Sequence, residues 1–185
     1  MTSNAPVCNR FSIMADIKER MIRAAKLDAN LYEEVEADKT ALGQAAVVVL
    51  LSSVAGGVGS LLDGGLSGLI VGVFASLIAW YVWAYVTYLV GAKLFPEPQT
   101  QADIGQLLRT TGFASTPGLI RVLGVIPGLA GIVSVVALVW MLIAMAVAVR
   151  QALDYSSTLR AAGVCAIGWL GLIAVFYLLG PGVSP

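Results

Sequence analysis

The chain contains no histidine, only two cysteines, and charge on only 12% of its residues. Without histidine it lacks the commonest general base and the commonest ligand of haem and transition metals. Its eleven basic residues are balanced by eleven acidic ones, which argues against a nucleic-acid partner. Cys8 lies in a polar segment and Cys165 in an apolar one, so the two are not expected to form a disulfide. We therefore expect no cofactor and no metal.

What the chain has instead is long apolar stretches. Hydrophobic residues make up 58% of the sequence and the mean hydropathy is +0.87, whereas soluble proteins are about 45–50% apolar. Stretches of about 20 apolar residues are long enough to cross a bilayer. We predict an all-α integral membrane bundle of five transmembrane helices, at about 43–62, 66–94, 107–126, 128–149 and 161–179. A flexible tail (1–12) and an amphipathic cytoplasmic helix (13–42) precede the membrane domain (43–180), and a short tail (181–185) follows it.

The first two predicted spans are joined at Asp63, Gly64 and Gly65, which we interpret as a tight turn. The third predicted span is irregular. It contains Pro117 and Gly118 and stops at Pro127 and Gly128, so we expect a broken helix rather than a continuous one.

The predicted N-terminal helix, 13–42, has a basic first half and an acidic second half. Its apolar stripe allows two interpretations. The basic half could lie on anionic headgroups with the stripe facing the membrane, or the helix could be solvated and pack its stripe against the rest of the protein.

Basic residues also predict the orientation. If the N-terminus lies in the cytoplasm, every lysine and arginine except Arg121 falls on the cytoplasmic side of the five spans. This distribution agrees with the positive-inside rule, and it places the C-terminus on the outer side.

Small residues follow one face of the second predicted span. Gly64, Gly68, Gly72 and Ser76 recur at four-residue spacing, which allows another helix to approach closely. Such a face serves either self-association and partner binding or internal packing of the bundle, and internal packing is the commoner use.

Arg121 is the single charged residue in the apolar stretch 113–139, which includes most of the irregular third span, and a guanidinium in hydrocarbon is costly. It could line a polar pathway, bind a lipid phosphate or hold the bundle together. Asp63 is the acidic residue expected on the same side of the membrane, so we hypothesise an Arg121–Asp63 pairing. The alternative is that Arg121 extends alone to the interface.

Catalysis has few candidate residues. The predicted spans contain no aspartate, glutamate or histidine, and their serines have no base to activate them. We predict that the protein is not an enzyme.

Three segments and one turn resemble the bacterial branch of the Yip family of membrane proteins, whose eukaryotic members interact with Ypt/Rab GTPases. They are YEEVEAD at 32–38, LLRTTGFASTPG at 107–118, the turn at 126–128 and AVRQALDY at 148–155. The resemblance covers roughly residues 30–180. It implies five spans, a cytoplasmic N-terminus, a bacterial inner (plasma) membrane location and no catalysis.

We expect a non-catalytic accessory or scaffolding subunit that binds membrane lipids, other integral membrane proteins or further copies of itself. The alternative is a small transporter or channel component that uses the irregular third span and Arg121. A polar-lined chamber at mid-depth would favour that alternative.

Overall fold

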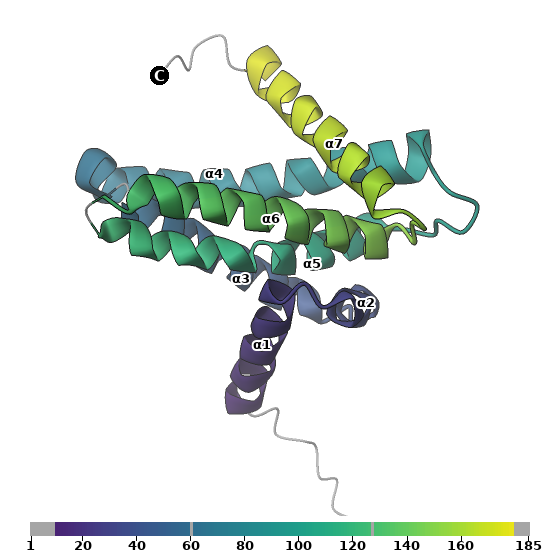
Figure 1. Ribbon diagram of the computed structural model, residues 1–185, viewed down its shortest axis with the longest axis horizontal. Helices are drawn as coiled ribbons and strands as arrows, with labels where there is room; N and C mark the ends of the chain where they lie inside the picture. The colour runs from purple at the N-terminus through teal and green to yellow at the C-terminus, as the bar shows by residue number, and fades with distance from the viewer. Residues whose placement is uncertain (1–9, 60, 127, 180–185) are drawn as a thin grey trace, which may run out of the picture.

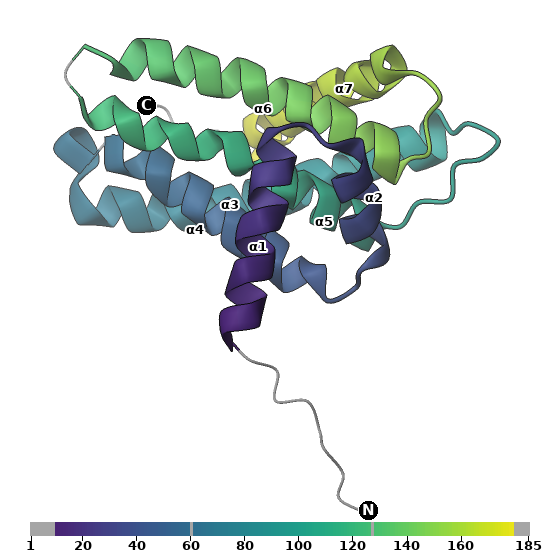
Figure 2. The same cartoon turned by 60° about the horizontal axis from the view of Figure 1, so that its bottom comes forward.

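The computed structural model describes residues 10–59, 61–126 and 128–179, with side chains described throughout except at 10–15, 59, 61–66, 175–176 and 178–179. All regular structure in these ranges is helical (Figures 1 and 2). In chain order the helices are α1 (Arg10–Ala25), α2 (Ala29–Ala37), α3 (Ala41–Gly59), α4 (Leu61–Tyr88), η1 (Leu89–Leu94), α5 (Ile104–Ala114), η2 (Thr116–Val125), α6 (Ala130–Ala152) and α7 (Thr158–Leu179).

Four helices run side by side along the long axis of the molecule: α3, α4, η2 and α6 (Figure 1). Helix η2 packs against both α3 and α6, and α7 crosses the bundle on α4 and α6. The end of α3, the start of α4, the end of η2 and the start of α6 lie together at one end of the molecule, which we call the turn end. The loop 95–103 and the link 153–157 lie at the other, the charged end. Helix α1 projects away from the bundle (Figure 2).

Three helical stretches are long and apolar enough to cross a membrane: Ala41–Val58, Ser67–Leu94 and Ala130–Ala152. They correspond to the first, second and fourth predicted spans. The stretch Thr158–Ala174 of α7 is apolar but shorter. The third predicted span is divided between α5 and η2. The protein is therefore an all-α membrane protein with three candidate spans among its described residues.

The irregular third span has a local physical cause. Helix α5 begins with a capping box in which the Asp103 carboxylate accepts from the Gln106 backbone N–H. Helix α5 ends at Ala114 with Ser115 as its C-cap, and Pro117 then occupies the first turn of the 3-10 helix η2. Proline cannot donate a backbone hydrogen bond, and it is tolerated best where a helix starts. The predicted break is therefore confirmed at this proline.

The prediction of one helix through 13–42 is wrong, because the structure has two helices there and α3 already begins at Ala41. The chain reverses at Leu27, whose φ of 61° lies in the left-handed region. Asp28 then caps α2, with its carboxylate accepting from the Asn30 backbone N–H at 3.0 Å. The basic half of the segment thus becomes α1, and the acidic half becomes α2.

The predicted turn at 63–65 is also wrong. Helix α4 begins at Leu61 and α3 ends at Gly59, so Asp63, Gly64 and Gly65 are the third to fifth residues of α4.

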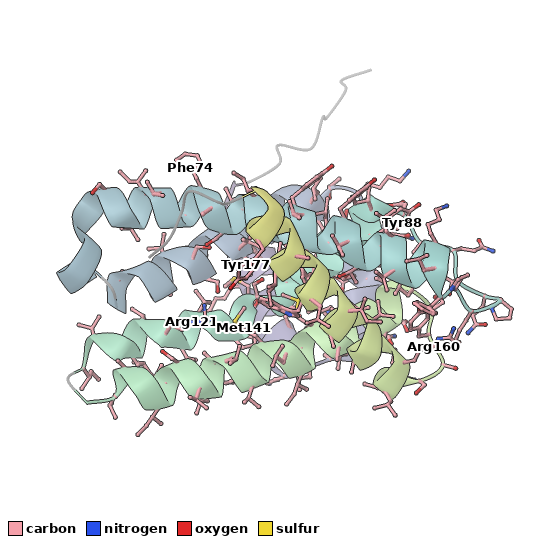
Figure 3. All side chains as sticks on the ribbon, turned by 90° about the horizontal axis from the view of Figure 1, so that it is seen from above. Phe74, Tyr88, Arg121, Met141, Arg160 and Tyr177 are labelled. Atoms are coloured by element: carbon pink, nitrogen blue, oxygen red, sulfur yellow. The ribbon has the colours of Figure 1, made fainter. Side chains whose placement is uncertain are left out.

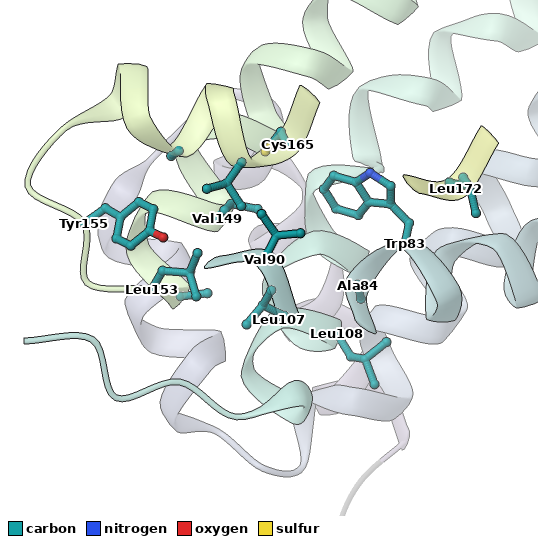
Figure 4. Packing of buried hydrophobic residues seen from close by; sticks show 13 residues of the cluster. Trp83, Ala84, Val90, Leu107, Leu108, Val149, Leu153, Tyr155, Cys165 and Leu172 are labelled. Carbon is teal, nitrogen blue, oxygen red and sulfur yellow. The ribbon is translucent and has the colours of Figure 1, made fainter. Parts of the chain in front are cut away.

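Two hydrophobic clusters hold the charged end together, and the segments that resemble the Yip family meet in them. One cluster joins Tyr32 of α2 to Phe113 of α5 and Ala148 of α6, all fully buried. The other joins Leu107 of α5 to Leu153 after α6 and to parts of α4 and α7 (Figure 4). The 32–38, 107–118 and 148–155 segments thus form one packed unit.

Candidate functional site

A chamber of about 710 Å³ lies between the helices of the bundle, with walls from α3, α4, η2, α6 and α7. Its volume falls within the range of about 300–1,000 Å³ that is typical of small-molecule sites. The lining is mostly apolar. Its charged and hydroxyl-bearing residues are Ser52, Ser53, Ser76, Ser115, Arg121 and Ser134.

The chamber is long and follows the bundle axis. On α4 its lining begins at Gly68 and reaches Trp83, and fifteen residues of α-helix extend about 22 Å. Gly56 and Gly57 of α3 line it near the turn end, while Trp169 and Leu172 of α7 line it at the opposite side. A ligand in this chamber would therefore be elongated along the bundle.

Arg121 extends from η2 into the space between the helices (Figure 3). Its Cδ lies 3.5 Å from the position that a Cβ would occupy on Gly56, so the alkyl part of the side chain lies against α3. The residue is half-buried, and among the described residues it makes no hydrogen bond and no ion pair. The Asp63 side chain lies outside the described residues, so the Arg121–Asp63 pairing stays a prediction.

The structure brings the small-residue face to the same chamber. Gly68, Gly72 and Ser76 line it together with Arg121. No described heavy atom lies within 4 Å of a Cβ built on Gly68 or Gly72, and both residues are exposed. This part of the face is therefore not filled by internal packing among the described residues. Gly64 lies in α4, but its surroundings are outside the described side chains.

Other glycines permit the close helix contacts. A Cβ on Gly112 would lie 2.6 Å from the Ala45 Cβ, and α5 packs on α3 at this point. At Gly118 a Cβ would collide with Ser52 Oγ. These glycines have no repeat spacing, so nothing in the sequence marks them as contact positions.

The proline and glycine positions of the broken span have different surroundings. Pro117 and Gly118 are buried where η2 meets α3 and α6. Gly128 has a φ of 85°, which favours glycine, and it begins the return into α6. Pro127 lies outside the described residues.

The chamber's hydroxyl groups are mostly tied to their own helices. Ser53 donates to the Val49 carbonyl at 2.8 Å, and Ser76 donates to the Gly72 carbonyl at 2.7 Å. Such back-bonding is usual for serine in membrane helices. The described lining offers no carboxylate or imidazole beside them, and the described part of the chain holds no group of three metal-ligating His, Cys, Asp or Glu residues. The arrangement suits binding rather than proton transfer.

Trp83 and Thr87 mark the contact of α4 with α7. Gly168 of α7 approaches so closely that a Cβ there would lie 2.7 Å from Thr87 Oγ1. Within the described structure, Thr87 Oγ1 and Trp83 Nε1 are buried without a hydrogen-bond partner. Substitution of Gly168 would therefore push α7 away from α4.

At the charged end, Arg109 fastens α2 to α5. Its Nε donates to the Val35 carbonyl at 3.0 Å, and its Nη2 donates to the Glu36 carbonyl. Both acceptors lie in the last turn of α2, where carbonyls lack partners within the helix and cations are favoured. Sequence reasoning had counted Arg109 only as a cytoplasmic charge. Its neighbour Gln106 donates to the Glu36 carboxylate at 3.1 Å.

Glu36 is the carboxyl group most affected by this contact. Burial raises its pKa to about 7, and the negative charges of Asp154, Glu33 and Asp103 act in the same direction. The positive charge of Arg109 opposes them. The α2–α5 contact therefore favours the protonated form of Glu36.

Ion pairs join α1 to α2. Arg20 Nη2 lies 3.0 Å from Glu34 Oε1, and Arg20 Nη1 lies 3.0 Å from Asp38 Oδ2. A hydrogen bond from Arg23 Nε holds the pKa of Asp28 below its usual value. The apolar residues Ile17 and Ala24 of α1 are buried, which agrees with the interpretation that the stripe packs against the rest of the protein.

The Yip1 domain family matches residues 29–179. The chain belongs to this family. The match begins with α2 and extends to the end of α7, so it contains the whole chamber and the α2–α5 contact but not α1. No curated protein and no solved structure matches the chain.

Proposed function

We propose that this Yip1-family protein is a non-catalytic accessory or scaffolding protein that binds lipids and other membrane proteins within the bilayer. One observation carries the proposal. Gly68 and Gly72, which together we call the glycine wall, form the open part of the small-residue face. This wall borders the chamber in which Arg121 has no partner among the described residues. Small residues let a neighbouring chain approach a helix backbone, which is how membrane helices associate.

The proposed location is the inner membrane of a bacterium, with the charged end in the cytoplasm and the C-terminus on the outer side. Segment α5–η2 and helix α7 would then complete the five spans. The support is the distribution of basic residues, since Lys93, Arg109, Arg150 and Arg160 all belong to the segments that meet at the charged end.

Helix α1 is proposed to lie in the cytoplasmic headgroup layer. Exposed Lys18 and Lys26 can face lipid phosphates, and Ile22 is 47% exposed. An apolar groove of about 460 Å³ separates α1 from η2 and is lined by Ile17, Met21 and Ile120 among others. Trp140 Nε1 of α6 donates to the Ala25 carbonyl at 2.9 Å and holds the end of α1 in place.

The test uses a leucine at the open glycine wall. Gly68→Leu is expected to detach a partner protein or second copy, because the new side chain occupies the space that a neighbouring chain would use. Wild type and variant are purified in a mild detergent, resolved on a native gel and analysed by mass spectrometry of all retained proteins.

Gly43→Leu is the matched control, since Gly43 is another exposed helical glycine with nothing within 4 Å but lies outside the chamber. Identical complexes from wild type and Gly68→Leu would count against the scaffolding function.

The chamber also favours one rival, a small transporter or channel component. It combines a broken helix with a lone arginine, a combination found in transport sites. Anion flux into liposomes that is abolished by Arg121→Ala would support the rival. Flux equal to that of empty liposomes, together with a stable co-purifying protein, supports the scaffold.

A further inference from the structure

We infer that the chamber holds one anionic phospholipid, with its phosphate on Arg121 and one acyl chain lying along α4. The inference rests on the proposed binding function and names a ligand for it. Two properties of the chamber support it: its charge and its elongated, apolar shape.

The charge calls for an anion. Arg121 is the single charged residue among the described residues that line the chamber, and none of the described residues neutralises it. A guanidinium in an apolar site is strongly disfavoured unless it is paired. Its planar set of N–H donors matches two phosphate oxygens at once.

The position of Arg121 suits a headgroup. Its side chain lies against Gly56, three residues before α3 ends at Gly59, which is about 5 Å along a helix axis. Figure 3 shows the side chain beside Met141, in the middle of α6, so the guanidinium lies within the bundle, on the side of the turn end. A phosphate bound there would enter the bundle from the leaflet at the turn end.

The remainder of the chamber suits an acyl chain. The apolar walls of the chamber include Leu69, Leu138, Met141, Met145 and Leu172. The chamber is about 22 Å long, whereas one leaflet is half of a hydrocarbon core that is about 30 Å thick. The chamber is therefore long enough for an acyl chain that spans one leaflet. Because Gly68 and Gly72 are exposed, a lipid can enter sideways from the bilayer across their bare backbone.

The experiment measures lipid retained by the full-length protein. Wild type and variants are reconstituted in nanodiscs with equal amounts of phosphatidylglycerol and phosphatidylcholine, transferred to mild detergent and analysed by native mass spectrometry. Wild type is expected to retain one phosphatidylglycerol per chain. Arg121→Gln is expected to reduce this occupancy at least tenfold, and Arg121→Lys is expected to reduce it less because one positive charge remains.

Lys93→Gln is the control for charge, since Lys93 is an exposed cation at the charged end. It should retain the lipid as wild type does. Gly72→Leu narrows the chamber and should lose the lipid, whereas Gly43→Leu should keep it. The helicity measured by circular dichroism shows which variants are folded. The Arg121 variants do not change Gly68 or Gly72, so they test the charge separately from the shape of the chamber.

Equal retention of phosphatidylglycerol by wild type and Arg121→Gln would overturn the inference, as would equal retention of the two lipids by wild type. A fatty acid recovered in place of a phospholipid would overturn it too. The scaffolding function is tested separately, because that test compares the proteins that co-purify with wild type and with the Gly68→Leu variant and does not measure lipid occupancy.

Discussion

The two ends of the bundle differ in whether their polar groups are bonded within the protein. At the charged end the polar groups of α5 are buried and bonded: Thr110, Thr111 and Ser115 donate to carbonyls of their own helix, and Arg109 donates to α2. Toward the turn end, Gly68 and Gly72 are bare, and Arg121 has no partner among the described residues. The first region has a fixed internal structure, and the second has room for something else.

Helix length explains the contrast. Helix α4 has 28 residues, whereas α3 has 19. The longer helix therefore extends about 13 Å further, and the shorter one leaves space at the charged end that α2 and α5 occupy. Along the chamber, no described segment fills the space between the helices in the way that α2 and α5 do at the charged end.

The largest effect is expected from a comparison of two single variants, Arg109→Met and Arg121→Met. Arg109→Met leaves the Val35 and Glu36 carbonyls without their charged donor, which should lower the free energy of unfolding by about 3 kcal/mol. Arg121→Met, studied in detergent without added lipid, should not lower the free energy of unfolding, because the described structure contains no bond to lose and an unpaired guanidinium in an apolar site disfavours the folded state. Thermal unfolding in detergent measures both. Equal losses would remove the distinction between the two ends.

A smaller effect is expected from alanine at two glycines. Gly112→Ala would press a methyl group against Ala45 and should cost about 2 kcal/mol of stability. Gly68→Ala meets open space in a helix and should stabilise the protein by about 0.5–1 kcal/mol. Chemical denaturation in mixed micelles compares the two. Destabilisation by Gly68→Ala would show that the wall is closed.

The smallest effect concerns pH at the α2–α5 contact. The pKa of Glu36 is raised from 4.5 to about 7, so the folded protein binds the proton more tightly than the unfolded chain does. The stabilisation from this group is complete below pH 4.5 and is lost as the pH rises through 7.

Glu36→Gln should remove this dependence and stabilise the α2–α5 contact by about 1 kcal/mol at pH 8. Hydrogen exchange of α2 between pH 5 and 8 is the measurement, with Glu19→Gln on exposed α1 as the control. A pH profile of α2 that is the same in wild type and Glu36→Gln would rule out Glu36 as the cause.

The broad fold could be predicted because its causes are local. Runs of apolar residues indicate spans wherever they occur, and Pro117 breaks a helix from its own ring geometry. The reversal at Leu27 could not be predicted in this way, since a leucine rarely adopts a positive φ and no glycine or proline marks the position. The separation of basic and acidic halves was the available signal, because the two halves pair across that corner.

The candidate site was predicted only in pieces. Arg121 and Gly68 each stood out, one by its charge and the other by its spacing. Their meeting depends on how α3, α4 and η2 are packed, which is not a property of any one segment. Arg109 was missed for the same reason, since its acceptors are more than 70 residues away in the chain.

The burial of α2 has a practical consequence. Leu31, Tyr32 and Val35 share one cluster with Phe113 of α5 and Ala148 of α6, and α6 continues directly into a candidate span. A fragment that ends at residue 40 would contain only the α2 side of that interface, and the apolar side chains of α2 would be exposed to water. Any molecule that recognises α2 in its native shape must therefore meet it while the whole protein is anchored in the bilayer.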